Sequence, residues 1–129
     1  MDYFPVFLDL KNRRCLLVGG GDVATRKGRM LSKAGAVLRV VAPEISGELR
    51  ELVTQQQGEL LLREYQTGDM NDCVLAVAAT DIHDLNEKVS TDAKQKNIPV
   101  EDMPKFVLSG QFGLDTMSDG GVKRRVRQL

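Results

Sequence analysis

Apolar and polar positions along the chain alternate in blocks that predict strands and helices in turn. Five short apolar runs are bounded by glycine, proline or charged residues, as is typical of strands that are buried on both faces of a parallel sheet. Between most of these runs, apolar residues recur at helical spacing. The predicted strands cover residues 14–18, 37–42, 60–62, 73–79 and 98–100, and the first predicted helix covers residues 22–34.

Capping residues mark the ends of the predicted helices. Gly35 follows the first helix as a left-handed C′ residue, and Ser46 caps a second helix that ends at Gly58. Thr80 or Asp81 caps a third helix. Its apolar face is predicted to consist of Ile82, Leu85, Val89 and Ala93.

This order of elements predicts an α/β fold. Strands that alternate with helices form a Rossmann-like, doubly wound parallel sheet, and right-handed crossovers favour the strand order 3-2-1-4-5. We expect this domain to cover residues 1–103. Glycines are frequent and apolar residues sparse further on, so residues 104–129 are expected to form a short irregular tail.

Composition narrows the class of protein. A chain of 129 residues is the size of one domain, and its 18 basic and 18 acidic residues balance, which argues against a nucleic-acid partner. No apolar stretch is long enough to cross a membrane, and the first residues do not resemble a signal peptide. Cys15 and Cys73 lie in predicted buried strands and are expected to be reduced, as in a cytoplasmic protein.

A glycine-rich turn joins the first predicted strand to the first predicted helix. Residues 19–24 fit the pattern G-x-G-x-x-A, with Gly19 and Gly21 at the glycine positions. One glycine permits a tight turn, another lets the backbone approach a diphosphate, and the small last residue lets helix and strand pack closely. Free N–H groups and the helix dipole favour phosphate there. The turn predicts dinucleotide binding, and the alternative is a tight turn without a ligand.

Two further segments at the carboxyl edge of the sheet are candidates for ligand binding. An acid that binds the adenosine ribose is expected where Ala42 and Pro43 stand, and Glu44 comes slightly later. In that role Glu44 would favour NAD over NADP, and the alternative is a solvated loop acid. Thr80 and Asp81 follow the fourth strand at the same edge, although a helix N-cap alone would explain Asp81.

Several short motifs, taken together, carry a family resemblance. They are Phe7-Leu8-Asp9-Leu10, Val18-Gly19-Gly20-Gly21-Asp22-Val23-Ala24, Arg26-Lys27, Ala34-Gly35-Ala36, Val41-Ala42-Pro43-Glu44, and Ala78-Ala79-Thr80-Asp81 with Asn86. With them the sequence resembles precorrin-2 dehydrogenase, the dehydrogenase/ferrochelatase module of siroheme synthases, over roughly residues 1–100. The combination is far more specific than a lone glycine pattern.

The resemblance implies an activity and a set of roles. Family members use NAD to oxidise precorrin-2 to sirohydrochlorin, and some also insert iron to give siroheme. The family's dinucleotide contacts fall on Asp22-Val23 and Pro43-Glu44, and its main catalytic aspartate, shortly after the fifth strand, falls on Asp102. Asp102 would take the proton that accompanies hydride transfer. Without the resemblance, a solitary acid there is equally explained as a turn residue.

The resemblance also predicts how the substrate binds and which oligomer forms. Precorrin-2 carries several carboxylates, which cations would bind. A homodimer is expected from the resemblance, but the tail looks shortened against the family, so an alternative is a non-catalytic module that binds NAD(H) or a tetrapyrrole. No His/Cys cluster suggests a metal site, and His83 is expected to be exposed. The candidate cations are Arg26, Lys27, Lys123, Arg124, Arg125 and Arg127.

Overall fold

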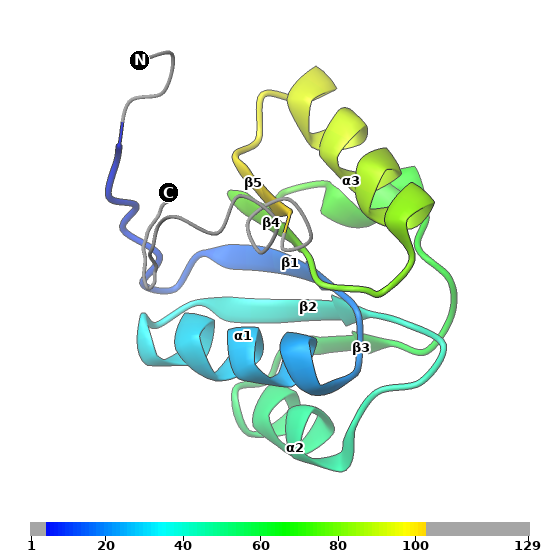
Figure 1. Ribbon diagram of the computed structural model, residues 1–129. Helices are drawn as coiled ribbons and strands as arrows, with labels where there is room; N and C mark the ends of the chain where they lie inside the picture. The colour runs from blue at the N-terminus through cyan, green and yellow to red at the C-terminus, as the bar shows by residue number, and fades with distance from the viewer. Residues whose placement is uncertain (1–4, 103–129) are drawn as a thin grey trace. The chain divides into compact units, whose positions relative to one another are not determined.

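Five parallel strands form one sheet in the computed structural model, which describes residues 5–102. The strand order is β3-β2-β1-β4-β5, as the sequence predicts, and residues 9–102 make up one unit (Figure 1). The predicted tail at residues 104–129 lies outside the described residues. The elements are β1 (Arg14–Val18), α1 (Asp22–Lys33), β2 (Val37–Val41), α2 (Gly47–Gln55), β3 (Glu59–Leu61), a 3-10 helix η1 (Thr67–Met70), β4 (Leu75–Ala78), α3 (His83–Gln95) and β5 (Val100–Asp102).

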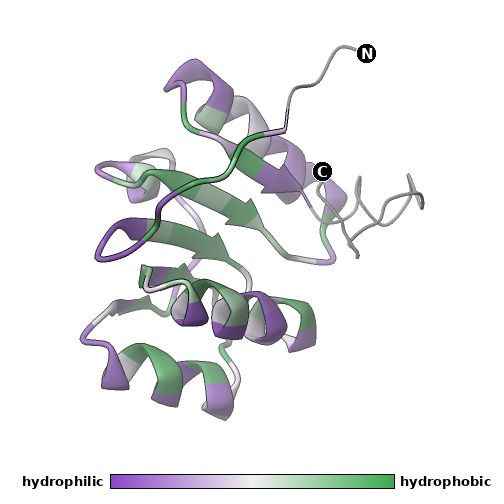
Figure 2. Ribbon diagram, turned by 90° about the vertical axis from the view of Figure 1, so that its left-hand side faces the viewer, coloured by the Kyte–Doolittle hydropathy of each residue, from purple (hydrophilic) through white to green (hydrophobic). Residues whose placement is uncertain are grey.

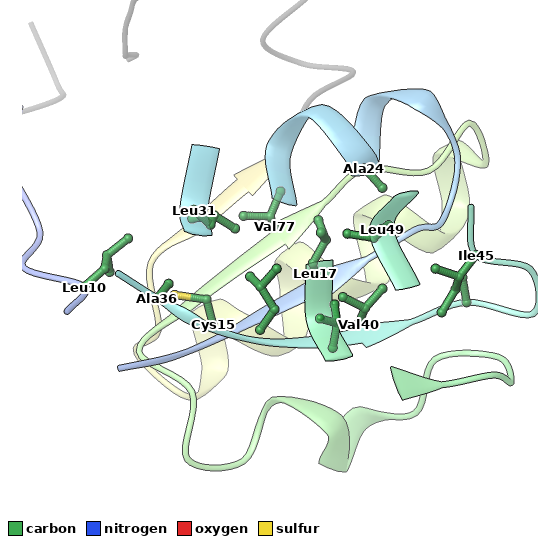
Figure 3. Packing of buried hydrophobic residues seen from close by; sticks show 14 residues of the cluster. Leu10, Cys15, Leu17, Ala24, Leu31, Ala36, Val40, Ile45, Leu49 and Val77 are labelled. Carbon is green, nitrogen blue, oxygen red and sulfur yellow. The ribbon is translucent and has the colours of Figure 1, made fainter. Parts of the chain in front are cut away.

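Helices cover both faces of the sheet, which is why its central strands are largely apolar. Along β1, Cys15 and Leu17 point into the core under α1 and α2, whereas Leu16 and Val18 point into the core under α3 and η1. Figure 3 shows Leu17 of the first core between Val40 and Val77 of the neighbouring strands. The helices turn hydrophilic surfaces outward, while the central strands between them are mostly hydrophobic (Figure 2).

The second helix ends earlier than predicted. The sequence places its end at Gly58, but α2 ends at Gln55, and Gln57 takes the left-handed conformation with φ 62°. Gly58 serves packing instead, because a Cβ there would lie 2.4 Å from the carbonyl oxygen of Leu38. A glycine after a helix therefore marks its end only to within a few residues.

The third helix and the fifth strand also differ from the prediction. Ile82 is half exposed and stands at the N-cap of α3 rather than on its buried face. The strand predicted at residues 98–100 is observed at Val100–Asp102, where Val100 pairs with Ala76 and Asp102 with Ala78. Pro99 has no N–H to donate and contributes only its carbonyl, which accepts a bond from Ala76.

Both cysteines are buried free thiols, as expected. Burial, with a smaller contribution from the neighbouring Cys73, raises the pKa of the Cys15 thiol to about 11. Among the described residues, no helix combines the length and the hydropathy that crossing a membrane requires.

Candidate functional site

The carboxyl ends of four strands form one straight row. Val41 of β2, Val18 of β1, Ala78 of β4 and Asp102 of β5 are successive register partners across the sheet. The loops that leave this row carry the residues that the sequence singles out. With neighbouring strands about 4.8 Å apart, the backbones of Val18 and Asp102 are separated by about 10 Å.

The structure explains in different ways why each of the three positions after β1 is a glycine. Gly19 has φ +134°, and a Cβ on it would lie 2.4 Å from the carbonyl oxygen of Ala79. A Cβ on Gly20 would lie 1.9 Å from the carbonyl oxygen of Glu44. A Cβ on Gly21, in contrast, would meet no atom within 4 Å. Gly19 and Gly20 are thus required by packing, whereas Gly21 leaves open space in front of the backbone, as close approach of a diphosphate requires.

The first turn of α1 presents backbone donors at this open space. The first N–H groups of any helix lack partners within the helix, and the N-cap Gly21 has no side chain that could accept from them. The side chains of Asp22 and Val23 are exposed there, while Ala24 is fully buried. Ala24 fits as the small residue of the pattern, since its Cβ is 3.3 Å from the position of a Cβ on Gly19. The residues present therefore fit a bound diphosphate.

The loop after β2 lies against the glycine turn. A hollow of about 320 Å³ is lined by residues of both segments. Glu44 is among them, and Pro43 is exposed beside it. Arg39, the nearest cation along β2, is engaged elsewhere: it donates to Glu59 at 2.7 Å and to the carbonyl oxygens of Asp69 and Asn71 at 2.7 and 2.8 Å. The lining residues of the hollow are Gly20, Gly21, Glu44, Ile45 and Ser46.

The loop after β4 is held by an amide that sequence periodicity does not reveal. Asn86 of α3 is fully buried, and its Nδ2 donates to the carbonyl oxygen of Thr80 at 2.8 Å. Its Oδ1 accepts from the Thr80 hydroxyl at 2.7 Å and from the Thr80 N–H at 3.3 Å. The expected N-cap role of Thr80 or Asp81 is wrong, because Ile82 is the N-cap of α3 and no side chain caps it. Asp81 is exposed at the edge.

Asp102 is the last residue of β5 and not a residue beyond the strand. It is half-buried, and side-chain alternation directs it to the face of Val100, which packs in the core under α3. The preceding Glu101 points to the opposite face, where the Lys27 ammonium donates to its Oε2 at 2.7 Å. Of the cations predicted for a polycarboxylate substrate, Lys27 is thus paired with a protein acid, Arg26 is exposed, and those at residues 123–127 lie outside the described residues.

Groups that commonly bind metals are dispersed in this part of the chain. Within residues 5–102, no three His, Cys, Asp or Glu side chains are grouped as metal ligands would be. His83 begins α3 and is exposed.

Comparison with known proteins identifies the family of this chain. Residues 6–107 match the family model described as "Putative NAD(P)-binding". The chain belongs to this family. It is 54% identical over 100 residues to the siroheme synthase of Pseudomonas fluorescens (strain SBW25) and 57% identical to that of Pseudomonas aeruginosa (strain LESB58). Each alignment covers 78% of this chain but only 22% of the relative, so the chain spans about a fifth of the length of these synthases.

A solved structure agrees with the sequence relatives. The structure of "SirC, precorrin-2 dehydrogenase" matches with a TM-score of 0.61 and 34% identity, over 68% of this chain and 44% of that chain. The resemblance stated from the sequence is confirmed. Membership of the NAD(P)-binding family indicates a nicotinamide dinucleotide as the cofactor.

Proposed function

We propose that this member of the NAD(P)-binding family oxidises precorrin-2 to sirohydrochlorin with NAD, in siroheme biosynthesis. The observation that carries the proposal is the shared row of strand ends, with the open glycine turn after β1 and the Asp102 carboxyl on β5. A dinucleotide whose diphosphate lies at the turn would extend along this edge toward β5. The similarity to siroheme synthases and to a precorrin-2 dehydrogenase supports the choice of substrate.

The choice of NAD over NADP rests on Glu44. Glu44 lines the hollow together with Gly20 and Gly21, where the adenosine ribose of a bound dinucleotide would lie. A carboxylate there accepts hydrogen bonds from ribose hydroxyls and repels a 2′-phosphate. Arg39, which could otherwise bind that phosphate, is occupied by Glu59 and two backbone carbonyls. The Glu44→Ser variant should therefore narrow the preference for NAD over NADP by about tenfold, measured as the ratio of the two dissociation constants.

The proposed reaction removes two hydrogens from the substrate. Bound NAD supplies the hydride acceptor. Asp102, at the end of β5, takes the accompanying proton on its carboxylate, so that sirohydrochlorin, NADH and a protonated acid balance the equation. The α1 amides and Glu44 bind and orient the dinucleotide at the opposite side of the row. Asp22, Val23, Pro43, Thr80 and Asp81 complete the proposed cofactor contacts.

Turnover of the full chain tests this function. Precorrin-2 and NAD should give matched increases of sirohydrochlorin and NADH absorbance. The Asp102→Asn variant should lower kcat by about 100-fold or more while the dissociation constant of NAD stays within about twofold. Asp84→Asn is the matched control, because Asp84 is an exposed acid in the first turn of α3 at the same edge.

Three results would redirect the proposal. Binding of NAD without turnover would favour the alternative, a non-catalytic module that binds NAD(H) or a tetrapyrrole. If NAD did not bind, the glycines of the turn would be explained by packing alone. An Asp102→Asn variant as active as the parent would move the proton acceptor elsewhere. Ferrous iron, added once oxidation is complete, tests the insertion that the resemblance implies for some family members.

The remaining parts of the proposal concern partners and location. A homodimer is proposed from the resemblance, and light scattering of the full chain measures it. A cytoplasmic location is proposed because the two cysteines are buried free thiols, as in a reducing compartment.

A further inference from the structure

A chain of hydroxyl groups connects the N-terminus of α2 with the glycine turn. The backbone N–H of Leu49 donates to the Ser46 Oγ at 3.1 Å, and this Oγ lies 2.7 Å from the Thr25 Oγ1. The Thr25 hydroxyl in turn donates to the carbonyl oxygen of Gly21 at 2.7 Å. Separately, the Ser46 N–H donates to the carbonyl oxygen of Gly20 at 2.8 Å. Ser46 and Thr25 thus bind the two carbonyls in the middle of the turn.

The direction of the hydroxyl chain follows from counting protons. A hydroxyl has one proton to donate, and that of Thr25 goes to the Gly21 carbonyl. The Ser46 hydroxyl must therefore be the donor to Thr25, while it accepts from Leu49. Thr25 is buried and Ser46 is partly so, which makes the chain strong, because consecutive hydrogen bonds polarise one another where water is excluded.

The bonded carbonyls determine where two amides point. A trans peptide unit is planar, and its N–H points opposite to its carbonyl. The Gly20 carbonyl shares a peptide unit with the Gly21 N–H, and the Gly21 carbonyl shares one with the Asp22 N–H. When Ser46 and Thr25 bind these carbonyls, both N–H groups are turned to the opposite side of their peptide units. A Cβ on Gly21, which lies between the two units, would meet no atom within 4 Å. Bonding at the carbonyl also polarises the same unit's N–H and makes it a better donor.

We propose that Thr25 and Ser46 are positioning residues for the diphosphate, because they aim and polarise the Gly21 and Asp22 amides. This inference rests on the proposed binding of NAD and adds two residues that neither the glycine pattern nor the comparisons single out. Neither side chain needs to touch the ligand. Ser46 also lines the hollow, so the same residue caps α2, lines the ribose side and orients the turn.

The Thr25→Val variant tests the proposal, since it removes the hydroxyl and preserves the shape. In the full chain, calorimetric titration should show NAD bound about threefold to tenfold more weakly. In the ligand-free protein, the Asp22 amide proton should shift upfield in a ¹H–¹⁵N spectrum as its peptide unit loses polarisation. Thr25→Ser retains the hydroxyl and should restore both values. Thr54→Val is the matched control, because the Thr54 hydroxyl bonds the Arg50 carbonyl in the same way on α2, at 2.9 Å, away from the turn.

The two readouts separate a positioning role from a structural one. If Thr25 had only a structural role, Thr25→Val would lower the melting temperature but leave both the NAD dissociation constant and the Asp22 resonance unchanged. Either of these two unchanged values would overturn the proposal. A parent protein that binds no NAD would overturn this inference together with the proposed function, whereas equal binding by parent and variant would overturn only this inference.

Discussion

The loops at the carboxyl edge are held in two different ways. Around the glycine turn, backbone bonds backbone and one hydroxyl adds to it: Gly19 N–H donates to the Val41 carbonyl at 3.0 Å, Ser46 N–H donates to the Gly20 carbonyl at 2.8 Å, and the Thr25 hydroxyl donates to the Gly21 carbonyl at 2.7 Å. Around β4 and α3, buried polar side chains hold the backbone instead, as Asn86 does for Thr80. The two regions face the same row of strand ends, and in the first a Cβ on Gly21 would meet no atom within 4 Å.

This difference bears on where we propose that the diphosphate binds. A turn built from close backbone contacts excludes side chains and so presents N–H groups to an anion. A loop whose N–H and carbonyl are both bonded to Asn86 has fewer groups left for a ligand. The glycine turn is therefore the proposed site of the diphosphate, whereas the loop after β4 is held by Asn86.

Substitution of the turn glycines should give the largest effect. Gly20→Ala places a Cβ 1.9 Å from the Glu44 carbonyl, and backbone must move to accept it. We expect a loss of about 3 kcal/mol in the free energy of unfolding, measured in urea, together with loss of NAD binding. Gly21→Ala is the contrast, because its Cβ meets open space: it should cost no more than about 1 kcal/mol of stability yet weaken NAD binding by tenfold or so. Equal stability losses in the two variants would contradict the assignment of Gly20 to packing.

Removal of the Asn86 amide should give the next largest effect. Asn86→Ala leaves the N–H and carbonyl of Thr80 without their partner in a partly buried place, which should lower the free energy of unfolding by about 2 kcal/mol. Glu87→Ala, at the exposed neighbouring position, should stay within about 0.5 kcal/mol of the parent. Urea titrations of both variants measure the difference. A loss in Asn86→Ala no larger than that in Glu87→Ala would mean that the loop after β4 does not depend on its amide.

The same contrast explains how far the sequence predicts the molecule. Glycines that exclude side chains form a visible pattern, so β1, the turn and the start of α1 are predicted to the residue. On α3 the buried face includes the polar residues Asn86, Ser90 and Asp92, which interrupt the apolar periodicity. For this reason the periodicity wrongly placed the exposed Ile82 on that face.

The edge strand shows a related limit. Polar Glu101 and Asp102 pair with β4 although nothing apolar marks them, so hydropathy placed β5 two residues early. The ion pair of Lys27 with Glu101 and the hydroxyl chain of Thr25 depend on residues 74 and 21 positions apart. Such contacts arise only from the tertiary arrangement and leave no local signal in the sequence.

Loss of the ion pair between the two regions should have a moderate effect. The Lys27 side chain, 12% exposed, joins α1 to β5 through Glu101. Lys27→Met keeps the aliphatic stem and removes the charge, which should lower the free energy of unfolding by about 1 kcal/mol and speed amide hydrogen exchange in Val100–Asp102. Lys33→Met, at the exposed end of α1, is the control. The charge-reversed pair Lys27→Glu with Glu101→Lys should recover part of the protection, and identical exchange in Lys27→Met and the parent would show that β5 is held by its strand pairing alone.

Acid should lower the free energy of unfolding by a smaller amount, through protonation of Asp69 in η1. Burial raises the pKa of the Asp69 carboxyl, but hydrogen bonds from Arg63 at 2.7 and 2.9 Å and from the Gln66 N–H outweigh it, so the pKa is lower than its ordinary value. A carboxyl whose pKa is lowered by folding stabilises the protein fully above its unfolded pKa of about 4, and this contribution is lost as the pH falls through the folded value. Urea unfolding at pH 7, 4 and 3 should therefore show a shallower decline with acid in Asp69→Asn than in the parent. Parallel declines in the two proteins would mean that the ionised Asp69 carboxylate does not contribute to the stability of this region.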